Sequence, residues 1–180
     1  MKWSIKTIRL RGVWILVPVF LVLARPQPET MVAGAMLAAA GAVVRAWASG
    51  TIRKNVVLTT TGPYAYTRNP LYVGSFLVGL GVTIASGSPW LVGLFLGFFV
   101  IIYGKTMRLE AEGLEARFGD RFREYAAAVP LFVPRLRPYR SMDAAQTQFM
   151  VRRYFTHREW ELLLGLALGF LALVVKMRWF

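Results

Sequence analysis

Apolar residues in this chain come in long uninterrupted blocks, and no other feature limits the possible folds as strongly. Hydrophobic residues make up 56% of the 180 residues, and the mean hydropathy is +0.48. Soluble domains are about 45–50% apolar even when glycine is counted. Because the blocks follow neither the helical nor the strand period, they indicate membrane-spanning segments. The sequence therefore predicts an all-α integral membrane protein.

The blocks and the turns between them predict about five transmembrane helices. Proline and polar residues at 25–29 and 86–89 mark two tight turns. Gly34, Ala38 and Ala42 follow one another at four-residue spacing, which allows close approach of a neighbouring helix. The first block lacks a cleavage site, so we interpret it as a retained span that extends back toward Ser4. The predicted spans cover residues 13–24, 30–49, 71–85, 90–103 and 162–175.

The charged region before the last span is predicted to lie outside the apolar layer. Residues 105–125 are expected to form an amphipathic helix, and residues 129–138 a proline-rich exit from it. Aromatic and basic residues mix over 144–160, which is typical of a helix lying on the membrane surface. We interpret residues 1–180 as one transmembrane domain, whose tail at 141–180 adds this interfacial helix and an extra span.

Membrane topology explains the net charge of +13 better than nucleic-acid binding does. Four Lys or Arg residues precede residue 13, three lie in 53–68 and eleven in 105–158, whereas the turns at 25–29 and 86–89 hold one and none. Because cytoplasmic loops are rich in Lys and Arg, the N-terminus and both basic segments are predicted to be cytosolic, with the C-terminus on the opposite side. The expected partners are membrane lipids, including anionic headgroups, and no nucleic acid.

Residue types that bind metals or form covalent intermediates are scarce. The absence of cysteine excludes disulfides, a thiol nucleophile and a thiolate metal site. His157 is the single histidine, so no multi-histidine metal cluster can form and no metal site is predicted. Gly79 and Gly81 lie within a span and lack the third glycine of a dinucleotide fingerprint, so we interpret them as helix-packing positions.

A polar strip, residues 56–72, lies between the second and third predicted spans. It is dense in hydroxyl groups and aromatic rings. Pro63 and Pro70 restrict their own φ angles and keep Gly62 and Asn69 out of the helical conformation. The polar strip is therefore predicted to be an ordered, extended connector that starts a helix near Leu71.

Glu110 lies where the fourth predicted span leaves the apolar zone. Ionisable groups near membrane depth cost several kcal/mol unless they are paired or solvated, so they are candidates for a function. Eight of the nine acidic residues lie between Glu110 and Glu161. We interpret the others near it as ordinary surface charges, which leaves Glu110 as the functional candidate.

The polar strip and the Glu110 segment together resemble a known family. Residues 62–74, GPYAYTRNPLYVG, resemble the "GPY…R(H/N)P.Y.G" signature of the isoprenylcysteine carboxyl methyltransferase and phospholipid methyltransferase superfamily. Residues 110–134 resemble its second signature, "EE..L…FG..Y..Y…VP". The resemblance covers about residues 45–134. It implies a cytosol-facing pocket for S-adenosylmethionine beside a lipid-facing tunnel for the methyl acceptor.

The resemblance also implies roles for individual residues. Glu110 and Arg108 are the expected catalytic residues, and Lys105 or Arg108 would replace the substrate-side arginine of the family. Asn69 stands where many members have histidine, and Ala111 replaces the second glutamate of the signature. The residues expected to line the cofactor are Val56, Val57, Leu58, Thr59, Tyr64, Asn69, Pro70, Leu71, Tyr72 and Glu110.

These observations predict methyl transfer from S-adenosylmethionine to the carboxylate or amine of an isoprenoid or lipid. Backbone N–H groups near Leu71 can hold the carboxylate of the cofactor, and Glu110 can accept hydrogen bonds from its ammonium or ribose hydroxyls. Two alternatives stay open: an NADPH-dependent sterol-reductase-like enzyme, which shares a similar "RHP.Y" motif, and a non-catalytic membrane scaffold. The sequence names neither the acceptor nor the oligomeric state.

Overall fold

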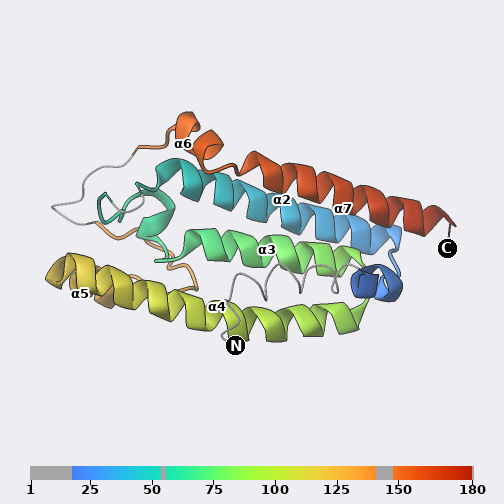
Figure 1. Ribbon diagram of the computed structural model, residues 1–180, viewed down its shortest axis with the longest axis horizontal. Helices are drawn as coiled ribbons and strands as arrows, with labels where there is room; N and C mark the ends of the chain where they lie inside the picture. Colours follow the sequence, from blue (N-terminus) through green and yellow to red (C-terminus); the bar gives the residue numbers. More distant parts are fainter. Residues whose placement is uncertain (1–17, 54–55, 141–147, 180) are drawn as a thin grey trace, which may run out of the picture.

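Two helices packed closely along their length, α2 (Pro28–Thr51) and α3 (Pro70–Ala85), form the centre of the bundle (Figure 1). The computed structural model describes residues 18–53, 56–140 and 148–179. A Cβ atom added at Gly41 would lie 2.7 Å from the carbonyl oxygen of Gly74, so only glycine permits this approach. The predicted contact is confirmed at Gly34 and Ala38, but Gly41 completes it instead of Ala42. With 3.6 residues per turn, residue 41 stays on the contact face and residue 42 turns away.

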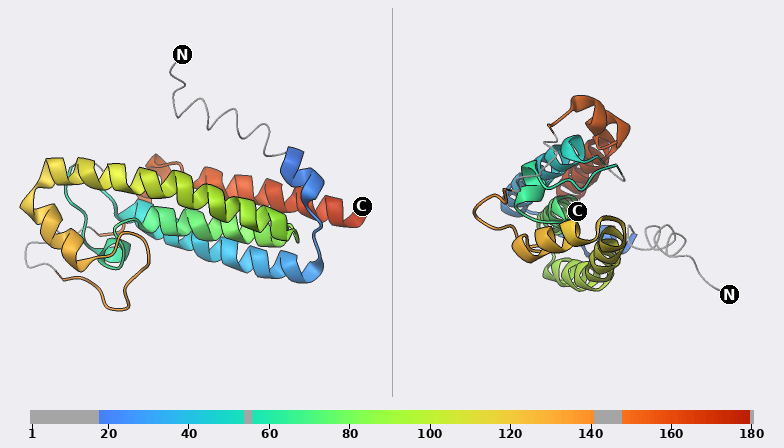
Figure 2. Two further views of the ribbon diagram at one scale, coloured as in Figure 1. Left: turned by 90° about the horizontal axis from the view of Figure 1, so that it is seen from below. Right: turned by 90° about the vertical axis from the view of Figure 1, so that its left-hand side faces the viewer.

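Helix α4 (Pro89–Phe118) packs beside α3, and helix α7 (Trp160–Trp179) packs against both α2 and α3 (Figures 1 and 2). Among the described residues, three helices, α2, α4 and α7, are long and apolar enough to cross a membrane. The apolar helix α3 has only 16 residues. Within the described residues every secondary-structure element is a helix, as predicted. Of the first predicted span, residues 13–17 lie outside the described residues and residues 18–23 are helical, so the count of five spans stays a prediction.

Gly119 interrupts the helix predicted over residues 105–125, and that prediction is wrong at this point. Helix α4 ends at Phe118, and Gly119 has a φ of +53°, which side-chain-bearing residues rarely adopt. Helix α5 (Asp120–Ala128) begins directly after it and turns back toward the bundle (Figure 2). The turn buries Phe122 and Tyr125, which a continuous helix would have carried away from the polar strip.

The tail is helical over a shorter stretch than predicted. Of the surface helix expected at 144–160, residues 144–147 lie outside the described residues, and the rest forms only α6 (Val151–Thr156). Arg158, with a φ of +57°, separates α6 from α7. The tail therefore changes direction immediately before its span begins.

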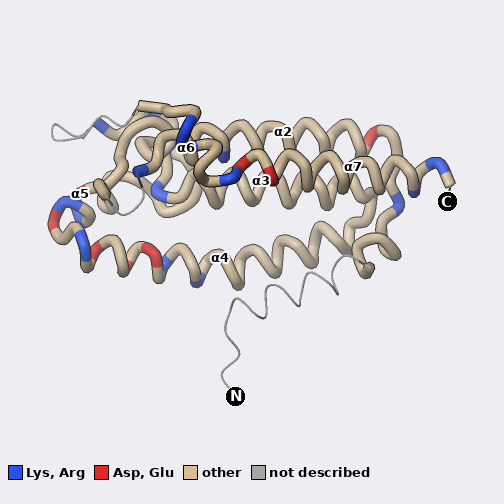
Figure 3. The backbone as a smooth tube through the Cα atoms, turned by 45° about the horizontal axis from the view of Figure 1, so that its top comes forward, with Lys and Arg blue, Asp and Glu red and all other residues tan. Residues whose placement is uncertain are grey.

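The connections of the bundle fall into two groups at opposite ends. At one end the backbone N–H of Arg25 donates to Ser86, 2.6 Å away, and Lys176 near the end of α7 contacts Leu21. The polar strip, α5 and α6 lie at the other end, where most Lys and Arg residues gather (Figure 3). The C-terminal end of α7 thus lies at the end of the bundle opposite the polar strip, and the side of the membrane that each end faces stays a prediction. The predicted position of the N-terminus falls on residues 1–17, outside the described residues.

Gly41→Ala is expected to destabilise the bundle by about 1–3 kcal/mol, because the new methyl group meets backbone atoms of α3 that cannot move aside. Thermal unfolding of the protein in detergent measures the change. Gly93→Ala is the matched control, since a Cβ atom there meets nothing within 4 Å and a helical alanine is more stable than glycine. Equal unfolding temperatures for the two variants would contradict the proposed packing.

Candidate active site

The polar strip is ordered by one short turn and by the start of α3. Gly62 begins a 3-10 helix, η1 (Gly62–Ala65), with a φ of +60° that favours glycine. Asn69 precedes the first residue of α3, Pro70, which matches the predicted helix start near Leu71. Tyr64 and Ala65 of η1 are buried. The strip is thus an ordered connector, as its two prolines predict, but it forms a 3-10 turn at residues 62–65 and is not extended there.

The strip pairs with the proline-rich segment that follows α5. The backbone N–H of Arg68 donates to Pro130 at 2.9 Å, and that of Tyr139 donates to Ala65 at 2.9 Å. The Asn69 side-chain amide donates to the carbonyl of Leu131 at 2.9 Å. This bond gives Asn69 a structural role that needs no imidazole.

Tyr125 of α5 connects the helix that precedes the proline-rich segment to the polar strip. Its buried hydroxyl donates to the Tyr64 carbonyl at 2.6 Å, and its ring packs in a cluster with Phe122 and Val129. Burial raises the pKa of Tyr125 above its ordinary value, although Arg68 opposes the effect. The hydroxyl therefore stays protonated and remains a donor across the physiological pH range.

Tyr125→Phe tests this connection. The Tyr64 carbonyl would lose its buried donor, so we expect a loss of about 1–3 kcal/mol in the free energy of unfolding. Chemical denaturation in detergent measures the loss. Tyr154→Phe is the control, because among the described residues no hydrogen bond involves the Tyr154 hydroxyl; a similar loss in both variants would argue against the connection.

The two predicted motifs meet at Tyr72 and Glu110. The Tyr72 hydroxyl donates to Glu110 Oε1 at 2.8 Å, and its ring packs edge-on against Tyr103, with centroids 5.3 Å apart. Tyr72 comes from the first turn of α3, and Glu110 from the part of α4 beyond its apolar stretch. Glu110 is exposed, so the contact lies on an accessible face of the site.

Two buried polar atoms of the strip, Tyr64 Oη and Arg68 Nε, have no hydrogen-bond partner among the described residues. Burial raises the pKa of Tyr64, and neighbouring Tyr125 raises it further. Burial lowers the pKa of Arg68, while Tyr125 acts in the opposite direction. An unpaired buried polar atom costs about 1–3 kcal/mol, so both atoms are suited to a polar ligand.

The remaining predicted site residues do not all gather at this contact. Thr59 is buried and accepts from the backbone N–H of Arg53 at 3.3 Å. Val56 is 64% exposed and lines a separate cavity near α6. Lys105 and Arg108 are exposed on α4, and neither forms a hydrogen bond or ion pair within the described part of the chain. Their roles stay predictions.

Sequence reasoning missed a buried ion pair that ties the tail to the strip. Arg45 donates to both carboxylate oxygens of Glu159, at 2.9 and 2.7 Å, and also to the carbonyl of Leu71 at 3.4 Å. Arg45 is on α2, Leu71 on α3, and Glu159 directly precedes α7. The two partners are 114 positions apart, so no local pattern could have revealed the pair.

Comparison with curated proteins finds three similar sequences. The cobalt-zinc-cadmium resistance protein CzcN of Cupriavidus metallidurans is 34% identical over 116 residues, 63% of this chain and 53% of that protein. The nickel-cobalt-cadmium resistance protein NccN of Alcaligenes xylosoxydans xylosoxydans is 37% identical over 89 residues, 49% of this chain and 41% of that protein. The protein-S-isoprenylcysteine O-methyltransferase of Schizosaccharomyces pombe is 33% identical over 81 residues, 45% of this chain and 34% of that protein.

The matched part thus spans about half or less of each relative's length. No solved structure matches the chain.

Within the described residues, no three His, Asp or Glu side chains lie together in a way that could hold a metal ion. The family model for phospholipid methyltransferases matches residues 30–121, which include α2, the polar strip, α3 and α4 through Glu110. The chain therefore belongs to the phospholipid methyltransferase family.

Proposed function

We propose that this protein transfers the methyl group of S-adenosylmethionine to a lipophilic acceptor at the cytosolic face of a membrane. Family membership supports membrane methyl transfer as the general reaction. The observation that carries the proposal is the Tyr72–Glu110 contact, which joins the two signature segments at one end of the bundle. A scaffold would not need an exposed carboxylate and a phenol to meet at this position.

The residues present fit the cofactor. Tyr64 Oη and Arg68 Nε are buried and unpaired within the described residues, so a ligand rich in donors and acceptors can satisfy them. Glu110 has a second carboxylate oxygen that can accept from an ammonium group or from ribose hydroxyls. Tyr72 can pack its ring on an adenine or against a sulfonium.

When bound, S-adenosylmethionine supplies an electrophilic methyl group on a sulfonium. The protein's contribution is to position and desolvate the reacting groups, which can lower the barrier by roughly 7–11 kcal/mol. Glu110 and Tyr72 would orient the polar end of the ligand. The polar strip, hydrogen-bonded to the proline-rich segment, would exclude water from the side of the ligand that faces it. A carboxylate acceptor needs no general base, whereas a protonated amine must first lose a proton.

The proposed sidedness follows from charge. Arg53 and Arg68 belong to the connector between α2 and α3, and Lys and Arg residues gather at this end of the bundle (Figure 3). Excess Lys and Arg marks cytoplasmic loops, so this end is assigned to the cytosol. Lys105 and Arg108, exposed where α4 leaves its apolar stretch, are suited to contact an acceptor carboxylate at the lipid boundary.

The decisive experiment measures ligand binding and methyl transfer separately. S-adenosylhomocysteine at about 100 times its Kd should stabilise the purified protein by about 2.7 kcal/mol, whereas NADPH should not. Membranes containing the protein and radiolabelled S-adenosylmethionine should then yield a labelled lipid-soluble product. Stabilisation by NADPH alone would instead favour a reductase. Absence of both stabilisation and labelling would overturn the proposal.

A further inference from the structure

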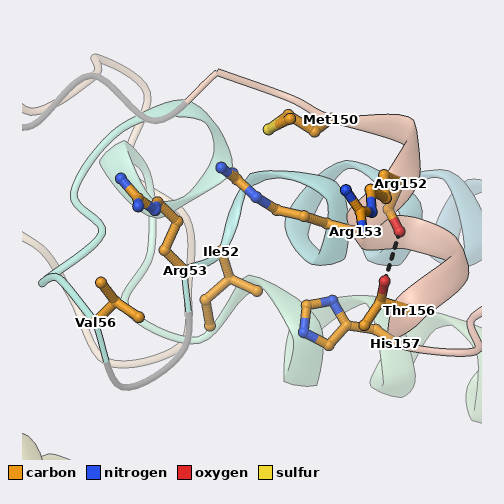
Figure 4. A pocket seen from close by; sticks show the side chains of 8 residues that line it. All are labelled: Ile52, Arg53, Val56, Met150, Arg152, Arg153, Thr156 and His157. Carbon is orange, nitrogen blue, oxygen red and sulfur yellow. Dashed lines mark hydrogen bonds between the residues drawn. The ribbon is translucent and has the colours of Figure 1, made fainter.

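A cavity of about 340 Å³ lies between the end of α2 and the start of α6, lined on one side by Arg53 and Val56 (Figure 4). The other side comes from the tail, with Met150, Arg152 and Arg153. The Arg153 side chain extends from α6 toward the segment that carries Arg53 (Figure 4). Two distant parts of the chain thus place three arginines around one hollow.

Among the described residues, no acidic side chain compensates the positive charge of this cavity. No acidic residue lines it. Within residues 18–53, 56–140 and 148–179, Arg53 and Arg152 form no ion pair. The nearby carboxylates are engaged elsewhere, Glu159 with Arg45 and Glu161 with Arg158. Arginines held together in this way favour an anion, since charge-assisted hydrogen bonds to phosphate or carboxylate are stronger than neutral ones.

The walls of the cavity are fixed by contacts between the tail and the last turn of α2. Arg153 Nη1 donates to the carbonyl of Thr51 at 3.0 Å, and the backbone N–H of Met150 donates to Gly50 at 2.9 Å. His157 Nδ1 lies 3.1 Å from the carbonyl of Ser49. These bonds use only part of the Arg153 guanidinium, which has five N–H donors in all.

The ends of two candidate spans place the cavity near the depth expected for lipid headgroups. Helix α2 ends at Thr51 and α7 begins at Trp160, and both are candidate spans, so the cavity is just beyond the apolar layer. Phe155 on α6 is 58% exposed and Trp160 is 40% exposed, as is common where a chain meets the membrane interface. Ile52 and Met150 give the same cavity an apolar wall.

We propose that this cavity binds the phosphate group of an anionic phospholipid from the surrounding membrane. The arginines would hold the phosphate, and the apolar wall would contact the glycerol and upper acyl region. The proposal is independent of methyl transfer, because it places a lipid where the tail docks on α2 and uses neither Tyr72 nor Glu110.

The test uses the full-length protein in neutral detergent micelles and measures its binding of fluorescent phosphatidylglycerol. Arg53→Gln combined with Arg152→Gln should weaken binding roughly 30-fold, as expected for two arginines at an anionic membrane surface. Both side chains are exposed, so the variant should unfold at the wild-type temperature. Arg137→Gln combined with Arg140→Gln removes two exposed charges at the same end and should bind as the wild type does.

Three competitors distinguish the sources of the phosphate. Unlabelled phosphatidylglycerol should displace the probe, whereas phosphatidylcholine and millimolar inorganic phosphate should not. Displacement by inorganic phosphate alone would overturn the assignment to a lipid. Displacement by S-adenosylhomocysteine would show that the cavity belongs to the cofactor site, and equal weakening in the control variant would show only general charge attraction; either result overturns the proposal.

Discussion

Glu159→Gln is expected to lower the free energy of unfolding by about 3 kcal/mol, since it leaves the Arg45 guanidinium without its carboxylate. Removing one partner of a buried ion pair typically costs about 3–5 kcal/mol. The Glu159 side chain is 7% exposed and that of Arg45 is 23% exposed, so we expect the lower end of this range. Thermal or chemical unfolding in detergent measures the loss.

The chain provides a closely matched control for this variant. Glu161 pairs with Arg158, but both side chains are largely exposed, and such pairs contribute about 0–1 kcal/mol. Glu161→Gln should therefore leave stability nearly unchanged. Replacing both members of the buried pair, as in Arg45→Met with Glu159→Leu, should restore much of the loss. Equal stabilities for Glu159→Gln and Glu161→Gln would refute the buried-pair interpretation.

Glu110→Gln is expected to weaken S-adenosylhomocysteine binding roughly 10- to 150-fold. A hydrogen bond to a charged group contributes about 1.5–3 kcal/mol, and an amide cannot replace the carboxylate as an acceptor for an ammonium. Isothermal titration calorimetry of the purified protein measures the change in Kd. Because Glu110 is exposed, the variant should keep the wild-type unfolding temperature.

Glu112→Gln is the control for that measurement. It removes the same charge from an exposed position two residues further along α4, where the helix presents a different face. Tyr72→Phe should have a smaller effect than Glu110→Gln, because Tyr72 orients the carboxylate but keeps its ring. If Glu110→Gln and Glu112→Gln bind the ligand equally well, Glu110 does not hold the cofactor.

Local sequence patterns predicted the parts of the fold that depend on local chemistry. Apolar blocks predicted helices, and the turn before Pro89 and the helix start at Pro70 follow from proline geometry. The family signatures correctly indicated that the polar strip and the Glu110 segment meet. The single-domain organisation and the roles of individual site residues stay predictions.

Features created by tertiary contact were beyond sequence reasoning. In the sequence, Gly119 looks like any other glycine within a helical pattern. Its positive φ results from the turn that brings α5 back to the bundle and buries Tyr125, which is a tertiary contact. The Arg45–Glu159 pair joins distant segments, each of which looks like an ordinary basic or acidic stretch. The arginine cavity also depends on how the tail docks on α2, which periodicity cannot indicate.

The short length of α3 bears on how deep in a membrane the proposed reaction would take place. A helix of 16 residues is about 24 Å long, whereas the hydrocarbon core of a bilayer is about 30 Å thick. Since α3 runs between the two ends of the bundle, we expect the chain beyond at least one end of α3 to lie within the bilayer if α3 crosses it. If that end is the one that carries Tyr72, we expect the reacting group of a lipophilic acceptor to reach the methyl donor while its hydrocarbon part stays in the leaflet.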